Sequence, residues 1–180
     1  DGAGTVTVNG SATYTGATTI NAGTFAYGAS GLLAGTNVTV KGVWNMGGIT
    51  DTVGTVTLVG GTIQNGILTA TTSYTLESGT ISAVLAGAIA VAKNTNGTVT
   101  LTGANTISST TTINAGTVVM SGSGTAVSTT ITINLGGTLT LDNTATNVAS
   151  RLGDALALTM NGGNFNCIGS SSAVSPETAG

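Results

Sequence analysis

The clearest pattern in the chain is a glycine followed by apolar residues at alternating positions. These marker glycines stand mostly 18 or 19 residues apart. They are Gly4, Gly23, Gly42, Gly61, Gly79, Gly97, Gly116, Gly137 and Gly163. Apolar residues at steps of two, with polar residues between them, are typical of a strand with one buried face. A helix would place them three and four residues apart.

Aligning the chain on the marker glycines gives two apolar columns. Two residues after each glycine stand Val6, Phe25, Trp44, Ile63, Ile81, Val99, Val118, Leu139 and Phe165. Four residues after stand Val8, Tyr27, Met46, Asn65, Ala83, Leu101, Met120, Leu141 and Cys167. Asn65 is the clear exception to the apolar rule. We expect Trp44 and Phe25 to be buried, one above the other, in the first column.

A second strand precedes each marker glycine, and a looser apolar position lies between the two strands. The inward residues of the second strand are Ile20, Val40, Leu58, Leu76, Ile113, Ile133 and Met160. The looser position is occupied by Tyr14, Leu33, Leu68, Ile107 and Val127. Three short strands in each period of about 19 residues indicate a coil in which each strand pairs in parallel with its equivalent one turn further on.

The pattern therefore predicts an all-β fold, a single-stranded parallel β-helix (β-solenoid). Residues 1–180 form one module of about nine turns of about 19 residues, because the rest of each coil serves as the crossover that parallel strands need. At a strand spacing of about 4.8 Å the stack would be about 43 Å long. An antiparallel sandwich would need hairpins about every ten residues and would not explain the longer repeat.

One unit of the repeat is copied closely. The stretch "GTVTVNGSATYTGATTINAGT" (4–24) returns as "GTVTLTGANTISSTTTINAGT" (97–117), with 13 of 21 positions identical. Together with "RLGDALALTMNGG" (151–163), this unit resembles the autotransporter-associated β-strand repeats of large bacterial surface proteins. The resemblance implies a right-handed β-helix located outside the cell, with an adhesive, spacer or matrix role. It brings no catalytic residue with it.

Composition narrows the possible partners. Only 5% of the residues are charged, whereas a globular domain usually has about 25%. The three basic residues, Lys41, Lys93 and Arg151, are too few to follow a phosphate backbone, so we expect no nucleic-acid partner. The longest apolar run, 83–92, is too short to cross a bilayer, so we expect no membrane insertion by this segment.

The residues needed for catalysis or metal binding are scarce. The chain has no histidine and a single cysteine, Cys167, which we expect to be a small buried hydrophobe. The acidic residues fall at different phases of the coil and so predict no paired-carboxylate site: Asp1, Asp51, Glu77, Asp142, Asp154 and Glu177. We therefore predict no catalytic, cofactor-binding or metal site and no cofactor.

Two polar features have structural interpretations. Arg151 and Asp154, three residues apart in the irregular last interval, could pair across a short helical turn that bulges from the solenoid. Asn21, Asn114, Asn134 and Asn161 recur at the end of the second strand. We expect their side-chain amides to stack as a ladder at one corner.

The sequence thus predicts a non-enzymatic extracellular structural module: a stalk, a surface shaft or a filament body. One alternative is an adhesin segment that binds a host or surface ligand. Another is an ice-binding β-helix that uses its Thr-x-Thr pairs. The chain starts at Asp1 without an initiator Met, and its first turn carries full repeat sequence. We therefore expect the solenoid either to continue covalently in a longer chain or to stack head to tail with copies of itself.

Overall fold

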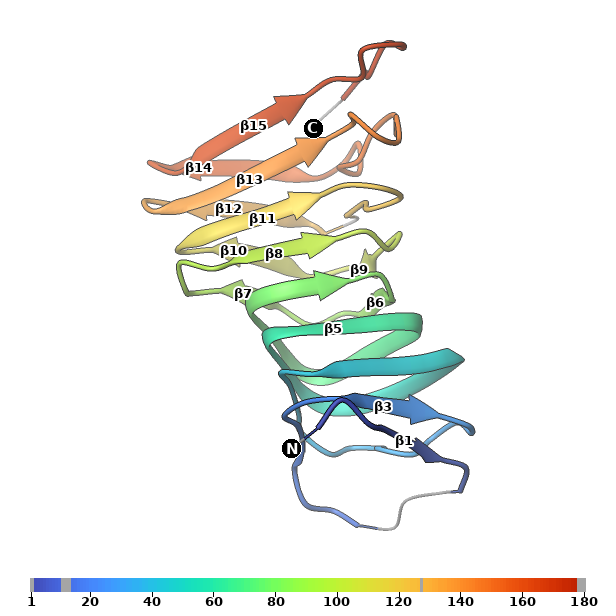
Figure 1. Ribbon diagram of the computed structural model, residues 1–180. Coiled ribbons are helices and arrows are strands. Elements are labelled where there is room, and N and C mark those ends of the chain that lie inside the picture. Colours follow the sequence, from blue (N-terminus) through green and yellow to red (C-terminus); the bar gives the residue numbers. More distant parts are fainter. Residues whose placement is uncertain (1, 11–13, 127, 178–180) are drawn as a thin grey trace.

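The computed structural model describes residues 2–10, 14–126 and 128–177. Within these ranges the regular secondary structure consists of β-strands alone, and the strands follow one another as stacked coils (Figure 1). The strands are β1 (Thr5–Val8), β2 (Thr18–Ile20), β3 (Thr24–Tyr27), β4 (Val38–Val40), β5 (Val43–Ile81), β6 (Val84–Gly87), β7 (Val91–Lys93), β8 (Thr98–Leu101), β9 (Thr106–Ile107), β10 (Thr110–Ile113), β11 (Gly116–Met120), β12 (Thr130–Asn134), β13 (Gly137–Asp142), β14 (Ala157–Asn161) and β15 (Asn164–Ile168).

Each strand pairs in parallel with its equivalent one coil away. On one face of the solenoid β8, β11, β13 and β15 lie side by side, and on another β7, β10, β12 and β14 do so. The 39-residue β5 stays extended while it winds around the coil, as Figure 1 shows. The predicted β-solenoid is confirmed. It has about 7 turns rather than the predicted number of about nine.

The inward columns form one continuous apolar core. Phe25 pairs with Trp44, as predicted; Trp44 is fully buried, whereas Phe25 is half-buried against the core. The columns continue through fully buried residues of the later coils: Leu58, Ile63, Leu76, Ile81, Val99, Ile113, Ile133 and Leu139. Of the looser apolar position, Leu33, Leu68 and Ile107 are buried. Tyr14 is exposed, contrary to the prediction, and Val127 lies outside the described residues.

From Gly23 onward, the marker glycines are required by the spacing between coils. A Cβ atom on Gly42 would stand 2.7 Å from the carbonyl oxygen of Gly23 in the coil below. Backbone atoms of the preceding coil crowd the same position in the later marker glycines up to Gly137. Real Cβ atoms do not come this close, so the glycine period follows from close backbone approach.

The pairing departs from the predicted columns at one place. Gly79 pairs with Val99, and Ile81 pairs with Leu101, so the strand that starts at Gly97 is displaced by two residues. A displacement by two keeps every side chain on its own face of the sheet. The core therefore stays apolar, although the simple alignment on glycines fails here. Asn65, the exception in the second column, has a φ of 58°, which asparagine tolerates better than other non-glycine residues.

Candidate functional site

Because no site was predicted, we searched for one among the buried polar side chains. Among the described residues, eight polar or charged side chains are buried: Thr36, Asp51, Lys93, Asn105, Thr111, Ser128, Asn143 and Arg151. A buried polar group costs folding free energy unless hydrogen bonds satisfy it. Their partners therefore decide whether these residues serve the fold or could serve a ligand.

Arg151 has the densest set of contacts. Its side chain is fully buried, and its Nε donates to Asn143 Oδ1 at 2.7 Å. The two terminal nitrogens donate to the backbone carbonyl oxygens of Gly124 (2.7 Å), Gly122 (3.1 Å), Asp142 (2.8 Å) and Thr146 (2.8 Å). The guanidinium thus ties the irregular segment 142–156 to the coil below, and each of its three nitrogens donates at least one hydrogen bond.

The C-terminal tail closes over the same segment. The backbone N–H groups of Arg151 and Leu152 donate to the two carboxylate oxygens of Glu177 at 2.9 and 2.7 Å. Burial lowers the pKa of Arg151, and the charges of Asp142 and Glu177 oppose that change. The predicted pairing with Asp154 is wrong: Asp154 is exposed, and the segment has no helical turn. Backbone carbonyls, which no sequence pattern reveals, satisfy the arginine instead.

Lys93 is the second buried cation. It lies in the inward column of the second-strand face as the register partner of Ile113, and its side chain is completely buried. Its Nζ donates to the carbonyl oxygen and hydroxyl of Thr95 at the corner. Burial lowers the pKa of Lys93, and the nearby charge of Glu77 partly opposes this. The sequence columns omitted Lys93 because the coil between Gly79 and Gly97 is irregular.

Asp51 is held as a structural acceptor. Tyr27 Oη donates to Asp51 Oδ2 at 2.7 Å, and the N–H groups of Leu33 and Thr52 donate to the same carboxylate at 3.3 and 2.8 Å. Burial and this carboxylate hold the pKa of Tyr27 well above its ordinary value. Among the described residues, no hydrogen bond links Asp51 to a second carboxylate, which paired acid–base chemistry would need.

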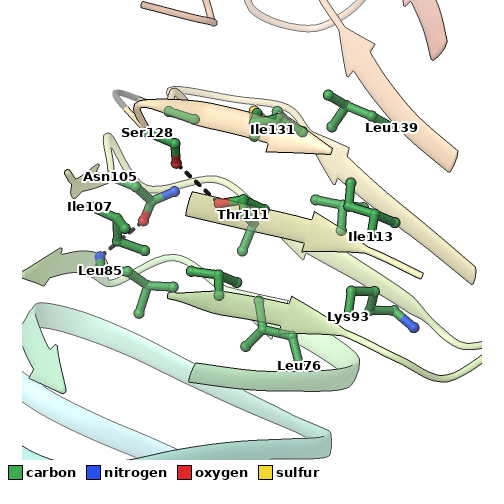
Figure 2. A pocket seen from close by; sticks show the side chains of 15 residues that line it. Leu76, Leu85, Lys93, Asn105, Ile107, Thr111, Ile113, Ser128, Ile131 and Leu139 are labelled. Atoms are coloured by element: carbon green, nitrogen blue, oxygen red, sulfur yellow. Dashed lines mark hydrogen bonds between the residues drawn. The ribbon is translucent and has the colours of Figure 1, made fainter. Parts of the chain in front are cut away.

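An enclosed cavity of about 20 Å³ lies in the core beside Lys93 (Figure 2). Its polar wall consists of Asn105, Thr111 and Ser128, whose groups are paired: Thr111 and Ser128 hydroxyls lie 3.0 Å apart, and Asn105 accepts from the N–H of Leu85 at 2.9 Å. In Figure 2 the Lys93 amine points away from these residues. The space is about that of one water molecule and is too small for an organic substrate.

The predicted asparagine ladder is present for Asn114, Asn134 and Asn161. Asn21, the fourth predicted member, does not join it, because the neighbouring position in the next coil is Lys41. Asn161 Nδ2 donates to Asn134 Oδ1 at 3.0 Å, Asn134 donates to Asn114 at 2.6 Å, and Asn114 donates to Asn94 at 2.6 Å. Asn94 was not predicted. A second ladder joins Asn65 to Asn45 at 3.1 Å. The amides bond to one another along the corner, which is a structural arrangement.

Threonines form a column that the sequence alignment did not single out. On the second-strand face Thr19, Thr39 and Thr57 are successive register partners. After an interruption at Ala92, the column continues through Thr112, Thr132 and Thr159. The Thr-x-Thr pairs of the other face are less regular, since Thr7 pairs with Ala26 and Thr100 with Val119.

Cys167 corrects another prediction. It lies in β15 as the partner of Leu141, in an inward column, yet it is exposed because no described strand covers β15. Partial desolvation and the charge of Glu177 raise the pKa of its thiol. A raised pKa leaves little reactive thiolate at neutral pH, so Cys167 is not an activated nucleophile.

No group of three or more His, Cys, Asp and Glu side chains that could hold a metal ion occurs in the part of the chain that the structure describes. In residues 2–10, 14–126 and 128–177, no helix is long and apolar enough to cross a membrane. The buried polar groups among these residues bond to the protein itself, with Trp44 Nε1 left without a partner.

Two segments of the chain, residues 1–26 and 93–120, match the passenger-associated-transport-repeat family. They contain the two copies of the 21-residue unit and correspond in the structure to the coils of β1 and β8. The resemblance to autotransporter passenger repeats is thereby supported. Neither the curated proteins nor the solved structures compared with the chain include a match.

Proposed function

Because the chain carries two passenger-associated transport repeats on a β-solenoid, we propose that it is a non-enzymatic structural module of a bacterial surface or secreted protein. Its role is that of a stiff segment in a stalk, shaft or filament. The observation that carries the proposal is that the buried polar side chains bond to other atoms of the protein. Arg151, Lys93 and Asp51 all bond to the protein's own atoms, which favours a structural role over ligand binding.

The architecture supports stiffness. Each coil is fixed to the next by parallel strand pairs on more than one face and by a continuous core. At a strand spacing of about 4.8 Å, the turns of this segment extend on the order of 35 Å along the axis. Repeated coils of this kind lengthen a shaft in proportion to their number.

The proposal can be tested by the cellular location of the protein and by the shape of the structures that contain it. Antibodies raised against the folded chain should label intact, unpermeabilised cells of the source organism, and electron micrographs should show the label on rods, fibres or a surface layer. Label that appears only after permeabilisation would contradict an extracellular shaft. A hydrolase or lyase activity lost when the acids Asp142 and Asp154 become amides would contradict the non-enzymatic role.

The threonine column favours ice binding as a second candidate. Thr112, Thr132 and Thr159 present identical side chains at the regular spacing of paired strands on an uncharged face. A flat repeating array of hydroxyl and methyl groups is suited to ordered water. Thr112→Tyr with Thr132→Tyr should abolish inhibition of ice recrystallisation, whereas Thr117→Tyr with Thr138→Tyr on the other face should not. Absence of inhibition in the unaltered chain rules this candidate out.

A further inference from the structure

The single tryptophan of the chain lies in a buried aromatic cluster beside a tyrosine. Trp44 is completely buried, and its ring stands edge-on to the ring of Tyr27, with the two centroids 5.7 Å apart. Tyr27 is buried as well, and Phe25 packs edge-on against the same tyrosine ring. Rings in this close contact can exchange an electron directly, without an intermediate carrier.

The phenol of Tyr27 is paired with a carboxylate that the backbone holds in place. Tyr27 Oη donates to Asp51 Oδ2 at 2.7 Å, and Asp51 Oδ1 accepts from the N–H of Thr52 at 2.8 Å. Asp51 is buried, so this hydrogen bond lies in a low-dielectric environment. A phenol that loses an electron becomes a strong acid, and a carboxylate at hydrogen-bond distance is a suitable acceptor for its proton.

The indole of Trp44 has no comparable acceptor. Among the residues whose positions are described, no group accepts a hydrogen bond from Trp44 Nε1. An oxidised indole becomes a weaker oxidant when its N–H proton can leave, because the neutral radical holds its missing electron less strongly than the radical cation. A buried indole that keeps its proton remains a strong oxidant. This difference between the two rings favours electron transfer from Tyr27 to an oxidised Trp44.

We propose that Trp44, Tyr27 and Asp51 form a radical relay, an activity that goes beyond the structural role. A one-electron oxidant, such as light together with a dissolved metal-complex acceptor, removes an electron from the Trp44 indole. Tyr27 then gives one electron to the indole radical cation. Its O–H bond breaks as the proton moves along the hydrogen bond to Asp51. The products are a neutral indole, a neutral tyrosyl radical and a protonated Asp51, so electrons, protons and charge balance.

Tyr74 supplies a matched control within the same core. It is also completely buried, but its hydroxyl bonds to the backbone carbonyl oxygens of Leu68 at 2.6 Å and Ala86 at 2.9 Å. A carbonyl oxygen accepts a hydrogen bond but is a much poorer base than a carboxylate. Tyr74→Phe therefore removes the same atoms from a buried ring as Tyr27→Phe, without removing a phenol–carboxylate pair.

Laser photolysis of the folded chain tests the relay, because Trp44 is the only indole that light can excite. The wavelength is one that indole absorbs and phenol does not, and hexaamminecobalt(III) takes the ejected electron and is reduced to cobalt(II). The absorption band of the indole radical should decay at the same rate as the tyrosyl radical band rises.

Substitution of each tyrosine identifies the electron donor. In Tyr27→Phe the indole radical should persist at least about tenfold longer, whereas Tyr74→Phe should leave its lifetime within about twofold of the unaltered chain. Equal lifetimes in the two variants overturn the relay. An unchanged β-sheet circular dichroism spectrum confirms that each variant is folded.

The role of Asp51 has its own measurement. Asp51→Asn keeps an oxygen that can accept from the phenol but loses the charge, so the transfer rate should fall by about tenfold. In the unaltered chain, which needs no refolding control, the transfer should be slower in heavy water than in ordinary water because a proton moves with the electron. A rate in Asp51→Asn equal to that of the unaltered chain, or equal rates in the two solvents, overturns the proton transfer to Asp51.

Discussion

Ile113 and Lys93 are register partners in adjacent strands, and both side chains are completely buried in the same column of the core. One is an aliphatic residue in an apolar ladder, and the other is an amine whose tip reaches the corner at Thr95. Burial lowers the pKa of Lys93. The fold therefore carries a titratable group in a column whose other members are apolar residues.

We predict that Lys93→Met raises the free energy of unfolding, and most strongly near neutral pH. Because the pKa is lower in the folded state, the unfolded state binds more protons between that pKa and the ordinary lysine pKa near 10.4, so stability of the unaltered chain rises with pH there. Urea denaturation from pH 7 to 9.5 should show the advantage of Lys93→Met shrinking as pH rises. Lys41→Met, at an exposed position, is the control. A variant less stable than the parent at every pH contradicts this prediction.

Removing Arg151 should destabilise the C-terminal coils. Arg151→Met leaves four backbone carbonyls and Asn143 without their donor. Each unsatisfied buried acceptor costs about 1–3 kcal/mol, and relaxation recovers part of this, so we expect a loss of at least about 3 kcal/mol. Hydrogen exchange should accelerate in 142–156. Asp154→Ala, at the exposed site once expected to pair with Arg151, should change stability by less than about 0.5 kcal/mol.

Trp44 should be the most costly single side chain to truncate in the N-terminal half. It is fully buried, stacks edge-on against Tyr27 with ring centroids 5.7 Å apart, and pairs with Phe25. Trp44→Ala should cost about 3–5 kcal/mol in chemical denaturation. Trp44→Phe should cost clearly less, because it keeps an aromatic ring and removes an indole N–H that has no partner. Equal losses in the two variants would show that cavity size does not set the cost.

The marker glycines from Gly23 onward should tolerate no side chain. Gly42→Ala places a Cβ against the Gly23 carbonyl, and the strain should cost at least about 1–3 kcal/mol. Gly16→Ala has no atom within 4 Å of the added Cβ and should be close to neutral. The difference between the two melting temperatures measures the effect of coil spacing. A Gly42→Ala variant as stable as Gly16→Ala would show that neighbouring coils can separate to admit a methyl group.

The repeat made the coil architecture predictable, since alternation of apolar residues and close backbone approach at glycine both leave direct traces in sequence. The predictions that were wrong depend on contacts between residues far apart in the sequence. Cys167 is exposed because nothing covers β15 among the described residues, although its column is apolar. The partners of Arg151 are carbonyl groups contributed by segments up to 29 residues away, and a carbonyl is present at every residue and so carries no signal.

The register at Gly79 and the burial of Lys93 were missed for a related reason. The coil between Gly79 and Gly97 keeps the length of the others, but relative to the glycine alignment its strands pair two residues out of step on one face and one residue out of step on the other. Alignment on the glycines assumes that every coil has the same number of residues between its strands, whereas the corners differ in length from coil to coil. Each face therefore has to be aligned by itself.

The order of the strands also determines how the molecule responds to mechanical load. Every coil is bonded only to the coils before and after it, through hydrogen bonds that run along the solenoid axis. A pull between the two ends acts along these bonds and concentrates on the outermost coil, so the chain should unwind one coil at a time. Each step would release about 19 residues, or about 60 Å of extended chain. A shaft built in this way lengthens in small increments under tension instead of failing at a single load.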